Sequence, residues 1–277
     1  MEVTFSQFLI VLGLTTFAGL STGIGGAVAF FSRTEHKDSG RFLSAMLGFS
    51  SGVMIFISLA ELLPEARSGL TSVFGVPWGG LTALAAFAFG ILLSAGIDKL
   101  IPEVENPHHV RTNNEFNRAA GADNAERARL GRSGLLFALA IGIHNFPEGL
   151  ATFAGGLSGI DVALPLTGAI AMHNIPEGIA IAVPIYYATG NRGKAFLYSL
   201  LSGLAEPVGA LIGFLILLPF LSPGLLAFLF AVVAGIMVFI TFDELLPMAE
   251  TYGKHHIAIG GLLIGMVFMG IGIEFLQ

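Results

Sequence analysis

The amino-acid sequence predicts an all-α integral membrane protein in which residues 1–277 form a single transmembrane domain. Of the 277 residues, 54% are hydrophobic and only 12% are charged, and the mean hydropathy is +0.81. Soluble proteins carry about twice that share of charged residues. The 37 glycines suit helices that pack closely in a bilayer. A soluble protein with eight buried helices would have too little sequence left to form its surface.

Eight stretches are long and apolar enough to cross a bilayer as helices, which takes about 20 residues each. They cover residues 5–31, 41–64, 77–98, 134–157, 162–187, 195–218, 223–248 and 257–276. The first stretch is longer than a cleaved signal peptide and lacks its basic start. The chain has no cysteine, which excludes disulfides and thiolate metal ligands.

Eight crossings place nearly all basic residues on one side of the membrane. Twelve of the thirteen Lys and Arg fall in the first, third, fifth and seventh connections, and only Arg67 falls in the others. Because cytoplasmic loops carry the excess of Lys and Arg, we expect a multi-pass protein of the cell (inner) membrane with both termini outside. The polar segment 101–132 is then a flexible cytoplasmic loop. Metal binding by two histidine pairs is left open: His108 with His109, and His255 with His256.

Two parts of the chain repeat in register. The stretches "GVMIFISLAELLPEA" (52–66) and "GIMVFITFDELLPMA" (235–249) share Gly, Met, Phe, Ile, Glu, Leu, Leu, Pro and Ala at corresponding positions. They belong to the second and seventh spans, which cross the membrane in opposite directions. We therefore expect a 3+2+3 inverted-repeat bundle, in which spans four and five form a central pair. Inverted repeats are typical of secondary transporters with a binding site near the bilayer midplane.

A short polar phrase also occurs twice within the apolar spans. "HNFPEG" (144–149) returns as "HNIPEG" (173–178) with one change of apolar residue. Residues three or four apart share one face of a helix, so each phrase projects a His, an Asn and a Glu together. Each proline removes one backbone hydrogen bond, and loosened backbone is tolerated in a membrane where it lines a polar cavity. The phrases therefore predict two half-sites that face a cation between them.

Six acids and two histidines lie well inside the expected spans, without any Lys or Arg. They are Glu61, His144, Glu148, His173, Glu177, Glu206, Asp243 and Glu244. A charge at the bilayer centre costs about 2.5–3.5 kcal/mol on insertion scales, so these acids must be protonated, hydrated or paired with an exogenous cation. The imidazoles indicate a metal ion rather than an alkali ion. Glu206 lies on a third helix, before the proline of "GLAEPVGA" (203–210).

These phrases resemble the ZIP (Zrt/Irt-like) family of divalent-metal transporters, and most closely its bacterial branch, over nearly the whole chain. "HNFPEG" and "HNIPEG" are similar to the signatures of the family's fourth and fifth helices. Three further motifs match its second, sixth and seventh helices: "MLGFSSGVMIFISLAELLPEA" (46–66), "GLAEPVG" (203–209) and "MVFITFDELLP" (237–247). The family has eight helices in a 3+2+3 inverted arrangement, with both termini outside.

The resemblance implies a two-metal site in which Glu148 and Glu177 bridge the two ions. One implied subsite consists of His144, Glu148, His173 and Glu177, with Met54 nearby as a soft ligand. The other consists of Asn145, Glu148, Asn174, Glu177 and Glu206. Along the transport pathway, the resemblance puts Asp243 and Glu244 at the inner exit and Glu61 at the mirror-related outer position. Animal members often carry a long His-rich third loop, whereas the corresponding segment here is short and holds one His pair.

Imidazole and carboxylate ligands suit Zn²⁺, Fe²⁺, Co²⁺ and Mn²⁺, and the absence of cysteine disfavours Cu(I). We expect a transporter that carries chiefly zinc into the cytoplasm by alternating access, with the metal as substrate and no cofactor. Iron, manganese and cobalt are left open as further substrates. The expected partners are divalent metal ions and the lipid bilayer, without nucleic acid; a homodimer and proton coupling are left open.

Two other classes of protein explain the sequence less well, and we expect no enzyme. A membrane zinc protease uses a His-Glu-x-x-His phrase, which this chain lacks. Membrane desaturase-type enzymes need many His ligands, and only two of the seven histidines lie within the expected spans. An ion channel needs weak binding for fast exit, which deep chelation by His and Glu opposes.

Overall fold

The computed structural model describes residues 4–31, 39–99 and 138–276, apart from residues 140, 144, 147, 151, 154, 157, 158, 218, 219 and 221. In this part of the chain every regular element is a helix. The α-helices are α1 (Phe5–Phe31), α2 (Ser39–Ile57), α3 (Leu63–Phe74), α4 (Trp78–Asp98), α7 (Ile160–Thr189), α8 (Arg192–Gly203), α9 (Ala205–Ile212), α10 (Pro223–Ile240), α11 (Leu246–Tyr252) and α12 (His255–Leu276). Among the described residues, the π-helical turns η1 (Ser58–Leu62), η2 (Gly213–Leu217) and η4 (Thr241–Leu245) interrupt them. The segment 101–132, with its pair His108 and His109, lies outside the described residues.

The composition of the helices identifies a multi-pass membrane protein. Among the described residues, seven helical stretches are long and apolar enough to cross a bilayer. The described residues between 138 and 156 are also helical, where the sequence predicts the fourth span. Large apolar side chains face outward, and Leu92 and Phe275 are 69% and 86% exposed. Because extended apolar surface of this kind marks contact with a membrane or a partner, these helices require lipid around them.

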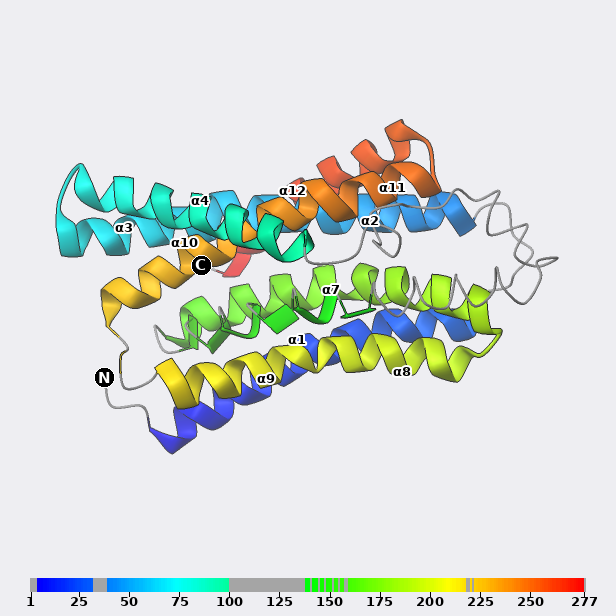
Figure 1. Ribbon diagram of the computed structural model, residues 1–277, viewed down its shortest axis with the longest axis horizontal. Coiled ribbons are helices and arrows are strands. Elements are labelled where there is room, and N and C mark those ends of the chain that lie inside the picture. Colours follow the sequence, from blue (N-terminus) through cyan, green and yellow to red (C-terminus); the bar gives the residue numbers. More distant parts are fainter. Residues whose placement is uncertain are drawn as a thin grey trace.

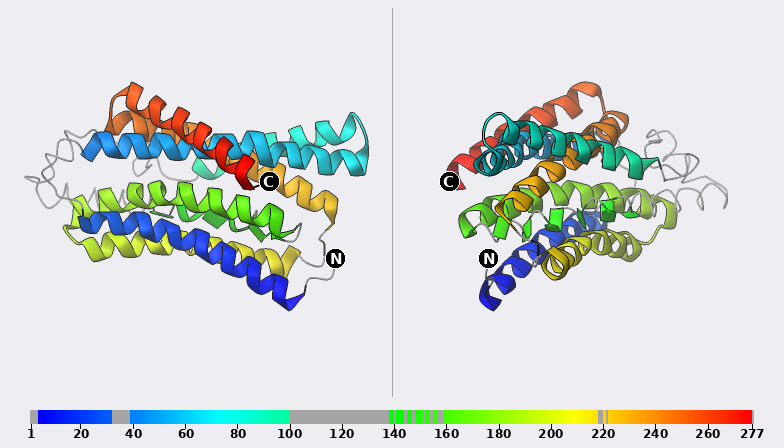
Figure 2. Two further views of the ribbon diagram at one scale, coloured as in Figure 1. Left: turned by 180° about the vertical axis from the view of Figure 1, so that it is seen from behind. Right: turned by 60° about the vertical axis from the view of Figure 1, so that its left-hand side comes forward.

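The helices form two layers (Figures 1 and 2). One layer holds α1, α7, α8, α9 and the helical stretch from residue 138, and the other holds α2, α3, α4, α10, α11 and α12. Helix α1 packs along α7 in the first layer, and α2 packs along α12 in the second. Helix α7 also contacts α2 and therefore joins the two layers. The second His-Asn-Ile-Pro-Glu-Gly phrase lies on this joining helix.

Glycines set the spacing between neighbouring helices. A Cβ atom added to Gly52 of α2 would lie 2.0 Å from the carbonyl oxygen of Leu262 on α12. One added to Gly90 of α4 would lie 2.1 Å from the carbonyl oxygen of Val232 on α10. Apolar burial gives little net attraction between helices in lipid, so close backbone approach supplies much of the packing energy. The high glycine content is explained by these contacts.

Both copies of the internal repeat contain the same backbone irregularity. The π-helical turns η1 and η4 begin at corresponding positions of the two repeated sequences. The N–H of Leu63 donates to the carbonyl of Ser58, and that of Leu246 donates to Thr241, so each bond reaches one position further than in an α-helix. Figure 1 shows α2 and α10, which lead into these turns, running in opposite directions. The sequence repeat therefore corresponds to two similarly built, oppositely directed helices.

The backbone deviates from α-helix at places other than the proline of the fifth span. Helix α7 stays α-helical on both sides of Pro176, where the sequence predicts loosened backbone. A proline removes a single hydrogen bond, and packing against α1, α2 and α8 supports the helix there. The described irregularities are the π-helical turns and Leu204, which separates α8 from α9. The second span is also longer than predicted, because its helix continues through η1 to Phe74.

Candidate metal centre

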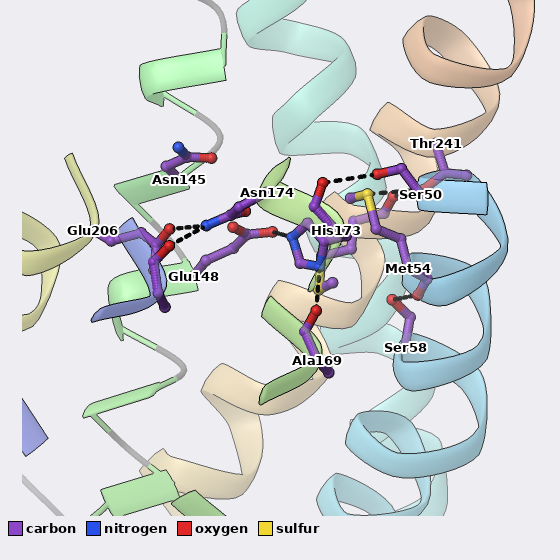
Figure 3. A network of polar contacts seen from close by, with 12 residues as sticks. Ser50, Met54, Ser58, Asn145, Glu148, Ala169, His173, Asn174, Glu206 and Thr241 are labelled. Atoms are coloured by element: carbon purple, nitrogen blue, oxygen red, sulfur yellow. Dashed lines mark hydrogen bonds and ion pairs between the residues drawn. The ribbon is translucent and has the colours of Figure 1, made fainter. Parts of the chain in front are cut away.

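Polar side chains from three helical segments and a methionine from a fourth lie at the junction of the two layers. The helical stretch from residue 138 supplies Asn145 and Glu148, α7 supplies His173, Asn174 and Glu177, α9 supplies Glu206, and α2 supplies Met54. Each of these side chains is at most 1% exposed. Figure 3 shows Glu206 on one side, Asn174 and Glu148 next to it, then His173, and Met54 on the other side. Burying so many polar groups in an apolar interior is costly unless they pair with one another or with a ligand.

His173 and Glu148 form a direct contact between α7 and the helical stretch from residue 138. His173 Nε2 lies 2.9 Å from Glu148 Oε1, and its Nδ1 lies 3.1 Å from the carbonyl oxygen of Ala169. A carbonyl only accepts, so Nδ1 carries a proton and donates it to Ala169. This hydrogen bond fixes the ring and directs Nε2 toward Glu148. Metal-ligating histidines are held by the same kind of bond from their second ring nitrogen.

The two asparagines hold their amide groups in similar ways. Asn174 Nδ2 donates to the carbonyl oxygen of Ala18 on α1 at 3.0 Å, and also to Glu206 Oε1. Asn145 Nδ2 donates to the carbonyl oxygen of Ser202 on α8 at 3.3 Å. Both Oδ1 atoms are buried and have no hydrogen-bond partner among the residues that the structure describes. The structure therefore offers two amide oxygens beside buried carboxylates.

Met54 brings a sulfur atom to the same region from the other layer. Its side chain is fully buried, and the Thr241 hydroxyl lies 3.7 Å from its Sδ. One turn earlier on α2, Ser50 donates to the carbonyl oxygen of His173 at 3.2 Å. This bond ties α2 to the part of α7 that carries the polar phrase. Met54 thus lies beside the centre, as Figure 3 shows.

The remaining predicted residues lie on two π-helical turns or outside the described residues. Glu61 lies on η1 and lines a cavity of about 40 Å³ together with Glu65. Asp243 and Glu244 lie on η4, and Glu244 borders a larger, mostly apolar cavity of about 870 Å³ between the layers. His144 lies outside the described residues. Within the described part of the chain, no three His, Cys, Asp or Glu side chains form a group that could hold a metal ion by themselves.

Several partners of the centre have no signal in the sequence. The carbonyl oxygens of Ala18, Ala169 and Ser202 orient the two asparagines and His173. A backbone acceptor is common to every residue type, so no side chain marks it in advance. The two π-helical turns place Glu61 and Glu244, and a proline shortly after each acid is their visible signal.

Comparison with known proteins agrees with this architecture. The chain matches a family model described as ZIP zinc transporter over residues 105–273. A zinc transporter ZupT of Akkermansia muciniphila is 54% identical over 272 residues, which cover 98% of this chain and 99% of that protein. The zinc transporters ZupT of Streptococcus mutans and Clostridium perfringens are 52% and 49% identical, and the alignments cover 94% and 97% of this chain and 95% and 96% of those proteins.

The helical fold defines a multi-pass membrane protein that buries His, Asn and Glu side chains between its helices. The matched model spans more than half of the chain, and the relatives align with nearly all of it. The chain belongs to the ZIP zinc transporter family. This family consists of membrane transporters rather than enzymes, and the resemblance to its bacterial branch is confirmed.

Proposed function

We propose that this protein carries divalent metal ions, chiefly zinc, across the bacterial inner membrane into the cytoplasm. The observation that carries the proposal is the buried pair of His173 Nε2 and Glu148 Oε1, 2.9 Å apart, with the imidazole fixed by Ala169. Imidazole nitrogen and carboxylate oxygen together suit Zn²⁺ and neighbouring divalent ions. The relatives named zinc transporter ZupT support zinc as the first choice.

A proton occupies the position that a metal would take between these two residues. Two lone pairs cannot approach to 2.9 Å without a shared proton, so either the imidazole or the carboxyl group carries one. A metal ion that binds Nε2 and Oε1 replaces this proton. Neutral imidazole and ionised carboxylate are the forms that ligate metals, and binding is therefore linked to proton release.

The proposal includes two metal positions that share Glu148 and Glu177. Nitrogen from His144 and His173 makes the first position softer, with Met54 beside it. Oxygen from Asn145, Asn174 and Glu206 makes the second harder, which would admit Fe²⁺, Mn²⁺ or Co²⁺. The buried amide oxygens of the two asparagines support this division.

Transport proceeds by alternating access in this proposal. Metal enters from outside past Glu61, is held between the two layers, and leaves past Asp243 and Glu244. The position of these acids on two π-helical turns with opposite helix directions supports a pathway with two related ends. Both termini lie outside, as the distribution of Lys and Arg predicts.

Zinc uptake into proteoliposomes of the pure full-length protein tests the function. We expect uptake by the wild type and its loss in Glu148→Ala and in Glu177→Ala, since each carboxylate is proposed to bind both metals. Removing an acid makes membrane insertion easier, so both variants should still insert. Glu274→Ala, at an exposed position of α12, is the matched control and should transport normally. Uptake near the wild-type rate in either site variant would overturn the two-metal proposal.

A further inference from the structure

A short sequence on α1 is similar to one at the junction of α8 and α9. "GLSTGIG" (19–25) and "GLAEPVG" (203–209) share two glycines and a leucine at corresponding positions. Their first glycines meet in the structure: a Cβ on Gly19 would lie 2.3 Å from the carbonyl oxygen of Gly203, and one on Gly203 would lie 2.0 Å from that of Gly19. This reciprocal contact is what a local two-fold relationship between the helices produces.

The hydrogen bonds of the asparagines follow the same relationship. Asn174 donates to the carbonyl of Ala18, and Asn145 donates to the carbonyl of Ser202. The asparagines are equivalent positions of the two repeated polar phrases, and each acceptor directly precedes the first glycine of one of the two glycine sequences. The donor and the acceptor of the first bond therefore occupy positions equivalent to the donor and the acceptor of the second.

A second pair of contacts assigns the counterpart of Glu206. A Cβ on Gly149 would lie 2.0 Å from the carbonyl oxygen of Glu206, and a Cβ on Gly178 would lie 1.9 Å from the carbonyl oxygen of Thr22. The two glycines each end one of the repeated polar phrases, and Thr22 and Glu206 are the fourth residues of the two glycine sequences. Thr22 therefore occupies on α1 the place that Glu206 occupies on α9. At this position the half of the centre built on α9 has a carboxylate, and the half built on α1 has a hydroxyl.

The hydroxyl of Thr22 differs from the other hydroxyls of α1. Thr15 and Thr16 each donate to the carbonyl one turn earlier in their own helix, as buried Thr commonly do. The corresponding carbonyl for Thr22 is that of Ala18, which already accepts from Ser21 and from Asn174. Its two lone pairs are thus in use. Thr22 Oγ1 is fully buried and has no hydrogen-bond partner among the described residues.

Two further side-chain oxygen atoms near the end of α8 are also buried without a hydrogen-bond partner among the described residues. Asn145 Oδ1 and Ser202 Oγ are buried and without a hydrogen-bond partner in the part of the chain that the structure describes. Ser202 Oγ lies 3.7 Å from the place of a Cβ on Gly142, about one helical turn before Asn145. Thr22 Oγ1 lies 2.9 Å from the place of a Cβ on Gly203, next to Ser202. An amide oxygen and two hydroxyls therefore lie near the end of α8, and Thr22 takes the position there that Glu206 takes in the other half.

We propose that Thr22, Asn145 and Ser202 form a neutral oxygen subsite that keeps water molecules on a hard divalent cation and thereby sets the preference between Mn²⁺ and Zn²⁺. The inference rests on the proposed metal transport. Amide oxygen and water suit Mn²⁺ and Mg²⁺, whereas zinc prefers few ligands and binds nitrogen. The two hydroxyls hydrogen-bond to metal-bound water, and Asn145 Oδ1 reaches the ion. Loss of a hydroxyl therefore weakens Mn²⁺ more than Zn²⁺.

Competition between Mn²⁺ and Zn²⁺ for uptake into proteoliposomes tests this subsite. Thr22→Val removes the hydroxyl at nearly constant volume, and we expect the Mn²⁺-to-Zn²⁺ ratio of kcat/KM to fall about fivefold, the effect of one hydrogen bond. Thr22→Ser keeps the hydroxyl and should keep the ratio. Thr15→Val is the matched control, because Thr15 is equally buried on α1 and its hydroxyl is bonded within the helix. Ser202→Ala, which leaves α1 intact, should shift the ratio in the same direction.

The ratio is independent of how much protein inserts correctly, so a partly destabilised variant still gives a result. An unchanged ratio in both Thr22→Val and Ser202→Ala overturns the subsite, as does an equal shift in Thr15→Val. Failure of Mn²⁺ to compete in the wild type also overturns it. Absence of zinc uptake by the wild type would instead refute the proposed transport, so the two failures are distinguishable.

Discussion

The carbonyl oxygen of Glu206 lies 2.0 Å from where a Cβ atom on Gly149 would be. Gly149 directly follows Glu148, so this contact brings the backbone of α9 against the helix that carries a proposed metal ligand. A side chain at position 149 would push the two helices apart, because both groups at the contact are part of the backbone. The distance between the carboxylates of Glu148 and Glu206 therefore depends on a glycine.

Replacing this glycine should disable the centre without changing any donor. We expect Gly149→Ala to lower the free energy of unfolding by about 1–3 kcal/mol, the usual cost of overpacking, and to reduce zinc uptake strongly. Gly13→Ala is the matched control, since nothing lies within 4 Å of its added Cβ. Thermal unfolding in detergent and uptake in proteoliposomes measure both effects. Equal behaviour of the two variants would show that the close approach is not required.

Zinc binding should release protons, because the proposed metal displaces the proton of the hydrogen bond between His173 Nε2 and Glu148 Oε1. The apparent zinc affinity should therefore fall as the pH is lowered. In Glu148→Gln the amide N–H donates to His173 Nε2, no shared proton remains, and the number of protons released per zinc should drop by about one. Calorimetry in two buffers of different ionisation enthalpy measures this number. The same number in wild type and variant would contradict the shared proton.

The absence of cysteine allows a direct test of the topology. Val76, in the turn between α3 and α4, is 84% exposed, and Lys254 is exposed in the turn between α11 and α12. Figure 1 shows these two turns at opposite ends of the bundle. In cells, we expect an impermeant maleimide to label Val76→Cys and to spare Lys254→Cys until the membrane is opened. Labelling in the reverse order would place both termini inside.

Periodicity and composition predict most of the helices but few of their irregularities. The bounds of α1 and the end of α12 follow from apolar length alone, whereas α12 begins two residues earlier than predicted, at His255. The spacing of His173, Asn174 and Glu177 predicts one shared face. Helical spacing cannot say which helix a face meets, so the contact of His173 with Glu148 required the structure. The π-helical turns shift the register of the residues that follow and depend on tertiary packing. The correspondence of Thr22 with Glu206 likewise required the contacts that α1 and α9 make with the two polar phrases.

Substitutions should separate the contribution of the nitrogen ligands to metal binding from that of the oxygen ligands. Glu206→Gln removes a charge but keeps an oxygen that can accept from Asn174, so α9 should stay in place. We expect it to weaken binding of the second metal about tenfold or more, since hydrogen bonds and ligands that involve a charged group are the stronger ones. His173→Ala removes the nitrogen that faces Glu148 and should weaken zinc at the first position more than Mn²⁺ at the second. Titration of both variants with each metal by calorimetry counts the sites and ranks their affinities. If both variants lose the same metal to the same degree, the centre has no softer and harder position, and its two metals are held by one common set of ligands.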